Sequence, residues 1–138
     1  MRDEIAQSRG YQSLQVLTDA VGLDVAEIAP ILELDQTLVG MVLQSGDIQK
    51  NLPNYEEVSG RFWMMLSVMS HFAEVSDYDK REMQGLFSPH AAQEYKDARV
   101  PPPWYPVGVK NYLSQNKLKG LDNCVKWLGG YSVGDTFI

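Results

Sequence analysis

The residues that could carry chemistry in this chain are few, and their spacing fits no catalytic arrangement. The sequence holds two histidines and one cysteine, and it lacks CxxC, HExxH and glycine-rich phosphate-loop motifs. His71 lies beside the apolar side of a helical pattern, and His90 stands at the start of a later one. Cys124 falls within an amphipathic pattern, which is typical of a small buried hydrophobe. The sequence therefore predicts a protein that is not an enzyme, with no catalytic residue, no metal ligand and no cofactor.

Composition places these residues in a globular chain of ordinary domain size. The 138 residues are 44% hydrophobic and 22% charged. No apolar run approaches the roughly 20 residues of a transmembrane helix, and the opening MRDEIAQSRG has no apolar core typical of a secretory signal. A single cysteine excludes an intramolecular disulfide framework. We expect a cytoplasmic protein that does not enter a membrane.

Charge is distributed unevenly along the chain. Residues 10–49 contain six acids and no base, whereas residues 80–126 contain eight bases and four acids, so their net charges are −6 and +4. The whole chain carries −6, which disfavours nucleic acid as the main partner because phosphate neutralisation dominates that binding. The two parts can attract each other or attract different partners.

Hydrophobic spacing predicts helices throughout, and the first three form a compact group. A helix should end at Gly22, and Asp24 with Glu27 forms a capping-box-like pair that opens the next one. Pro30 should shorten or kink that helix. Asp35 can cap a further helix that closes at Ser45-Gly46. Two short helices with a tight joint between them have the rhythm of a helix-turn-helix.

The later helices follow from the same signals. The longest pattern runs from Tyr55 to about Glu74 and is apolar nearly all round, with Trp63, Met64 and Val68 as a second apolar side. Shorter helices are expected from about 77 to 85, from Ser88-Pro89, from 109 and from 118, the last stopped by Gly129-Gly130 and followed by an extended tail. The fold class is all-α, in three parts: a helix-turn-helix-like unit (1–50), a connecting core helix (51–76) and a C-terminal helical interaction domain with a proline loop (77–138).

Several residues of the C-terminal part are candidates for binding a partner protein. Trp104 and Tyr105 stand in the stiff segment VPPPWYP, and rigid aromatic residues make good interface anchors. The alternative is a loop that packs its own tryptophan onto the core. Apolar residues at the terminus either fold back or insert into a partner. With the nearby cations, the candidate set is Arg99, Trp104, Tyr105, Lys110, Lys117, Lys119, Trp127, Tyr131, Phe137 and Ile138.

The order of these features resembles the Xre–MbcA–ParS type of bacterial antitoxin. In GLDVAEIAPILELDQTLVGMVLQSG, Ala29 matches the small residue of that family's first helix, Leu32 and Leu34 match the apolar pair around the joint, and Val39 matches the buried position of the second helix. Asp35 takes the place of the usual Ser or Thr cap, and Glu33 stands where the pattern prefers glycine. SPHAAQEYKDARVPPPWYPVGVKNYLSQNKLKGLDNCVKWLGGYSVGD is similar in order and spacing to the second part. The resemblance covers most of residues 12–135.

The resemblance implies a function. Members of that family pair with RES-type toxins, which consume NAD; the C-terminal domain covers the toxin's active site, and the complex often represses its own operon. This chain would then be a non-enzymatic inhibitor that contacts its toxin from about residue 88 onward. DNA contact by the second helix would rest on Gln36, Thr37, Gln44 and Ser45, with no Lys or Arg among them.

Two other interpretations remain open at this stage. One is a helical adaptor unrelated to antitoxins, in which the helix pair is a plain hairpin. The other is a stand-alone helix-turn-helix transcription regulator. In each case the apolar surface around Trp63, Met64 and Met65 exceeds what a small domain buries easily, so we expect a homodimer.

Overall fold

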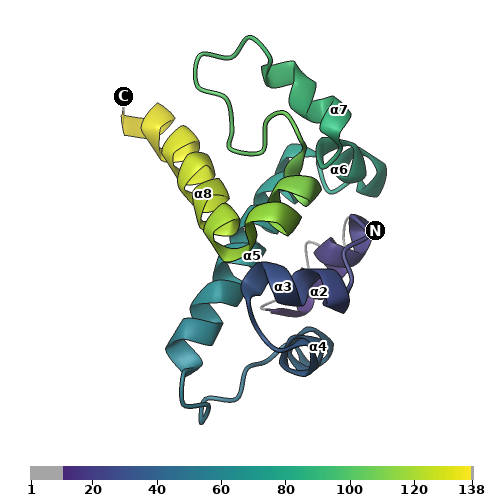
Figure 1. The fold of residues 1–138 in the computed structure, drawn as a ribbon, viewed down its shortest axis with the longest axis vertical. Helices are drawn as coiled ribbons and strands as arrows, with labels where there is room; N and C mark the ends of the chain where they lie inside the picture. Colours follow the sequence, from purple (N-terminus) through teal and green to yellow (C-terminus); the bar gives the residue numbers. More distant parts are fainter. Residues whose placement is uncertain (1–10, 138) are drawn as a thin grey trace.

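The computed structural model describes the backbone of residues 11–137 and the side chains of residues 14–129. Within that part the chain is all-helical, as predicted, with no strand (Figure 1). The elements in order are α2 (Tyr11–Ala20), α3 (Val25–Leu32), α4 (Gln36–Ser45), α5 (Tyr55–Val75), α6 (Lys80–Leu86), α7 (Pro89–Ala92), the 3-10 turn η1 (Gln93–Tyr95) and α8 (Val109–Phe137).

Side-chain caps set the boundaries of the first helices. The amide of Glu27 donates to Asp24 Oδ1 at 2.9 Å and the amide of Asp24 donates to Glu27 Oε1 at 3.2 Å, so the predicted capping box is confirmed. Asp35 Oδ2 accepts from the amides of Thr37 and Leu38, which opens α4. Pro30 lies on the exposed side of α3, and that helix ends two residues later. Helices α3 and α4 are thus joined by three residues, 33–35.

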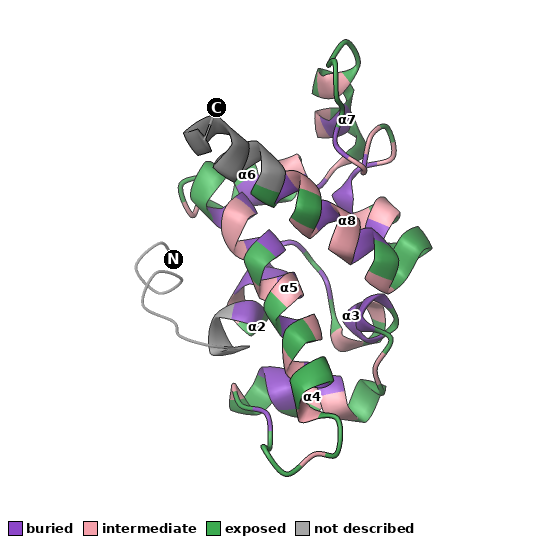
Figure 2. Ribbon diagram, turned by 90° about the vertical axis from the view of Figure 1, so that its left-hand side faces the viewer, coloured by how far each residue is buried: buried purple, intermediate pink, exposed green. Residues whose placement is uncertain are grey.

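The core lies around α5, which crosses the centre of the molecule (Figure 1). Its buried side chains fall at helical spacing, and they contact α2 on one side and α8 on the other. Exposed and buried stretches alternate along α5 (Figure 2). The predicted helix from Tyr55 to about Glu74 is confirmed, because the observed helix ends at Val75.

Helix α6 begins later than the sequence suggested. Asp77 and Tyr78 both adopt left-handed conformations, with φ of 54° and 61°, so they form a turn rather than the first turn of a helix. Asp79 provides the N-cap instead, since its Oδ1 accepts from the amide of Glu82 at 2.9 Å. The error arose because two aspartates two positions apart offer the same capping signal.

Gly108 permits a close approach between α7 and α8. Its φ is +92°, and a Cβ there would lie 2.9 Å from the backbone nitrogen of Pro89 and 3.0 Å from the carbonyl carbon of Ser88. A side chain at this position would therefore push the start of α8 away from α7.

Helix α8 is bent where two helices were predicted, and it extends further than predicted. Lys117, with φ 54° and ψ −134°, separates segment 109–116 from segment 118–137. The predicted stop at Gly129-Gly130 and the predicted extended tail are wrong, because the backbone stays helical to Phe137. Glycine costs a helix about 1 kcal/mol relative to alanine, and that penalty alone does not end it. None of the helices in the described part of the chain is long and apolar enough to cross a membrane.

Candidate interaction surfaces

Two of the residues first considered for chemistry, Cys124 and His71, are affected by burial. Burial raises the pKa of the Cys124 thiol to about 12, so the thiol stays protonated at neutral pH. Burial lowers the pKa of His71, and the nearby Glu74 carboxylate offsets part of that effect. Among residues 14–129 no cluster of His, Cys, Asp and Glu is arranged to hold a metal ion.

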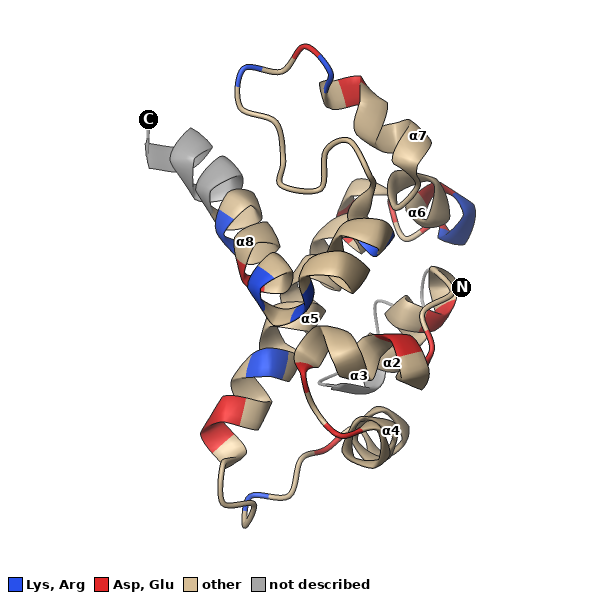
Figure 3. Ribbon diagram, in the orientation of Figure 1, with Lys and Arg blue, Asp and Glu red and all other residues tan. Residues whose placement is uncertain are grey.

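The oppositely charged parts of the chain contact each other. Lys110 Nζ lies 3.2 Å from Glu27 Oε2 and donates to the carbonyl of Gly22 at 3.4 Å, which joins α8 to α3. The amide of Leu118, just after the bend in α8, donates to Glu33 Oε2 at 3.4 Å. Lys110, a candidate partner residue, is thus engaged within the chain. Figure 3 shows only acidic residues on the described parts of α2 and α3, whereas bases are prominent on α6 and α8.

Arg61 is a residue whose role the sequence reasoning missed. Its Nη1 donates to the carbonyls of Leu32 at 3.2 Å and Glu33 at 3.0 Å, and its Nη2 pairs with the Glu57 carboxylate. The guanidinium thus caps the C-terminus of α3 at the joint, where Glu33 adopts φ 55°. The sequence signal for this role was weak: Arg61 is the single arginine between Arg9 and Arg81. The Glu33 carbonyl that it binds lies 28 residues earlier, so sequence spacing did not indicate the contact.

The second half of the proline loop, which comprises residues 96–108, packs against the core. Trp104 is 2% exposed, and its ring lies 5.2 Å from that of Trp127 and 5.5 Å from that of Phe72. The amide of Gly108 donates to the carbonyl of Trp104 at 2.8 Å. Tyr105 is half-buried and precedes a cis bond to Pro106. The structure therefore places Trp104 in the core, as the alternative interpretation of this loop expected.

The first half of the loop is exposed. Residues 96–101, here called the loop tip, are all exposed, and Val100 is 71% exposed. The backbone between α7 and α8 extends away from the helices as a long loop (Figure 1). An exposed valine and guanidinium thus stand on a loop that a buried indole anchors four residues later.

The other candidate residues of the C-terminal part are scattered. Lys117 and Lys119 are exposed at the bend of α8. Trp127 is half-buried against Tyr95 and Trp104, with ring centroids 6.1 and 5.2 Å away. The side chains of Tyr131 and Phe137, and the whole of Ile138, lie outside the described residues. Among the candidates whose side chains the structure describes, Trp104 and Trp127 lie in the aromatic cluster, whereas Lys117 and Lys119 lie at the bend of α8.

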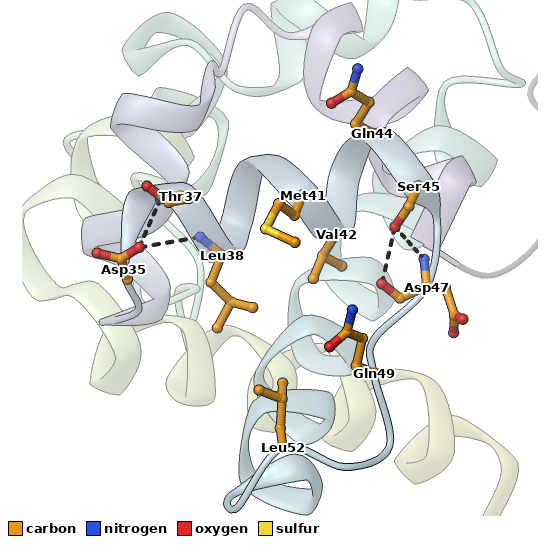
Figure 4. Close-up of a pocket in the computed structure, with 10 residues that line it drawn as sticks. All are labelled: Asp35, Thr37, Leu38, Met41, Val42, Gln44, Ser45, Asp47, Gln49 and Leu52. Carbon is orange, nitrogen blue, oxygen red and sulfur yellow. Dashed lines mark hydrogen bonds between the residues drawn. The ribbon is translucent and has the colours of Figure 1, made fainter.

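A groove runs along α4 and the segment that follows it (Figure 4). It holds about 530 Å³, and its apolar side chains come from Leu38, Met41, Val42 and Leu52. Leu38, Val42 and Leu52 point toward one another, whereas Gln44 points away (Figure 4). Sequence reasoning missed this groove because Leu52 approaches α4 only through the fold of the linker.

Three of the four residues suggested for DNA contact line this groove. Thr37, Gln44 and Ser45 are exposed there, while Gln36 is exposed outside it. Ser45 Oγ exchanges hydrogen bonds with the backbone of Asp47, both at 3.2 Å. The carboxylates of Asp35 and Asp47 also line the groove, and no Lys or Arg does. Such a surface repels phosphate.

Comparisons with known proteins add no assignment. No family model, no curated protein and no solved structure matches this chain.

Proposed function

We propose that this chain is a non-enzymatic, antitoxin-like regulator that acts in the cytoplasm by binding a partner protein through the tip of its proline loop. The observation that carries the proposal is the anchored loop: Trp104 is buried in an aromatic cluster while Val100, four residues earlier, is 71% exposed.

The loop tip indicates the chemistry of the partner surface. Arg99 offers a planar cation that suits a carboxylate, and Val100 suits an apolar hollow beside it. Lys96 is also exposed on the loop. Asp97 is exposed there too and reduces the net charge of residues 96–101 to +1, so the partner patch should present a carboxylate for Arg99 beside a small apolar hollow. By the resemblance of its sequence, the partner is a RES-type, NAD-consuming toxin whose active site the C-terminal part covers.

Direct DNA reading by α4 is not part of this proposal. The exposed side of that helix carries no base, and aspartates lie at the groove beside it. Repression of its own operon would require cations from elsewhere in the complex.

The test is a mixing experiment between the full chain and a RES-type toxin encoded beside it. The wild-type chain should form a stable complex and stop NAD consumption. Arg99→Glu and Val100→Asp should each weaken binding about tenfold or more, as central interface residues do. Val75→Asp is the matched control, because Val75 is 59% exposed on α5 and lies outside the loop.

Two results would contradict the proposal. The first is the absence of any complex at tens of micromolar of both proteins. The second is a complex whose affinity is unchanged by both loop variants, since the loop tip would then lie outside the interface.

A further inference from the structure

Trp63 is exposed on the central helix. Its side chain is 62% exposed, although tryptophan is among the most buried residue types on average. One turn before it lies Gly60 and one turn after it Ser67, both exposed, so small residues flank the indole on the same side of α5. The Ser67 hydroxyl is satisfied locally, because it donates to the carbonyl of Trp63 at 2.9 Å.

A groove of about 220 Å³ opens beside this stripe, between α5 and α8. It is lined by Ser67, Val68, His71, Val125, Leu128 and Gly129. Ser67 and His71 follow Trp63 at successive helical turns, so the protruding ring and the groove share one side of the molecule. Among residues 14–129, whose side chains the structure describes, no Asp, Glu, Lys or Arg lines the groove, which makes that part of it suited to an uncharged ring.

Two glycines border this surface, and no close contact within the chain requires glycine at either position. A Cβ added to Gly60 in α5 or to Gly129 in α8 would meet no atom within 4 Å beyond the adjacent helix backbone. Each glycine costs its helix about 1 kcal/mol relative to alanine. The fold of one chain does not require them. Both glycines permit another helix to approach α5 and α8 closely from outside, because helix separation depends on side-chain size at the contact.

We propose that this surface pairs with the same surface of a second copy, with the two α5 helices antiparallel and Trp63 of each copy inserted into the α5–α8 groove of the other. A two-fold axis near Ser67 brings residue 63 of one copy beside residues 67–71 of its partner. The same rotation therefore places each Trp63 ring in the groove of the other copy. Such pairing is isologous and closes on itself. The partner we infer is a second copy of this chain, because this one surface carries both a protruding ring and a groove that can receive such a ring. The two lie one or two helical turns apart.

Oligomeric state, measured by sedimentation equilibrium on the full chain from about 1 to 200 µM, tests the proposal. The wild type should be a dimer at the upper end of that range. Trp63→Ser should raise the dimer dissociation constant about 100-fold or more, as loss of a central aromatic anchor does. Gly129→Arg should do the same by filling the groove, while leaving the fold intact because space is open at that Cβ.

Two control variants separate the interface from general effects. Gly85→Arg places the same side chain at another exposed helical glycine with nothing within 4 Å, in α6. Met41→Ser removes an exposed apolar side chain from a different helix, α4. Both should dimerise like the wild type, and far-ultraviolet circular dichroism should show unchanged helicity for all four variants.

Two outcomes would overturn the proposal. A wild-type chain that is monomeric at 200 µM would leave the surface for a different protein. A dimer that tolerates both Trp63→Ser and Gly129→Arg would use another face of the molecule.

Discussion

The guanidinium of Arg61 donates to the carbonyl oxygen of Glu33 at 3.0 Å, and this bond joins the central helix to the turn between α3 and α4. Glu33 is left-handed, with φ 55°, a conformation that favours glycine. A non-glycine residue pays a steric cost in that conformation. Arg61 offsets the cost by satisfying the carbonyls at the end of α3.

We expect Arg61→Ala to lower the free energy of unfolding by about 2 kcal/mol, because hydrogen bonds to a charged, largely buried group are lost. Urea denaturation followed by circular dichroism measures the change. Arg81→Ala, at an exposed arginine of α6, is the control and should change stability by less than about 0.5 kcal/mol. Equal stability of the two variants would show that the Arg61 cap contributes nothing.

Gly108→Ala should destabilise the fold more than Gly22→Ala. Both glycines have positive φ, at +92° and +76°, so both variants carry backbone strain of about 1 kcal/mol or more. Only the Cβ at 108 would also meet backbone atoms, at 2.9 Å from Pro89 N, whereas nothing lies within 4 Å at 22. The midpoint of thermal unfolding should fall further for Gly108→Ala. The reverse order would mean that α7 and α8 are not held this closely.

Stability should fall on acidification below about pH 6.5, in part through His71. Burial lowers the pKa of this histidine, so the unfolded chain binds the proton more tightly than the folded chain. The stabilisation from the neutral imidazole is complete above the unfolded pKa and is lost as pH falls toward the folded pKa. His71→Gln should show a smaller loss between pH 7.5 and pH 5.5 than the wild type. An NMR titration that places the His71 pKa above 6.5 would contradict the sign.

Trp104→Ala should cost about 3 to 5 kcal/mol of stability, because a buried indole is removed from contact with Phe72, Tyr95 and Trp127. Trp104→Phe should cost less than half of that, since an aromatic ring remains in the cluster. Trp63→Ala, measured where the chain is monomeric, should change stability by less than about 1 kcal/mol, because Trp63 is exposed. Chemical denaturation of the three variants gives the order. Similar losses for both alanine variants would contradict the observed burial.

Local signals in the sequence predicted the helices well. The capping box of Asp24 and Glu27 and the cap at Asp35 are confirmed, because a cap needs only residues two or three positions apart. The break between the two segments of α8 was likewise expected. The predictions failed where a local signal was ambiguous: Asp77 and Asp79 offered competing caps, and Gly129-Gly130 weakened α8 without ending it.

The candidate surfaces followed less closely from the sequence. The aromatic proline loop was singled out correctly as a distinct segment, but Trp104 and Val100 have opposite exposure within it. The four polar residues of α4 were correctly assigned to one helix, yet the groove that three of them line also needs Leu52 from the linker. Composition identifies residues that can bind a partner, whereas burial decides which of them remain available.

By itself the sequence determined an all-α chain, the caps and most helix boundaries, and a division into an acidic first part and a basic later part, because these depend on near neighbours and on counts of residues. Only the tertiary structure decided that Lys110 pairs with Glu27, that Arg61 caps α3, and that Trp104 is buried while Trp63 is exposed. A tryptophan has the same affinity for the core at either position. Which one reaches the core depends on how the helices pack, and packing joins residues that no short stretch of sequence brings together.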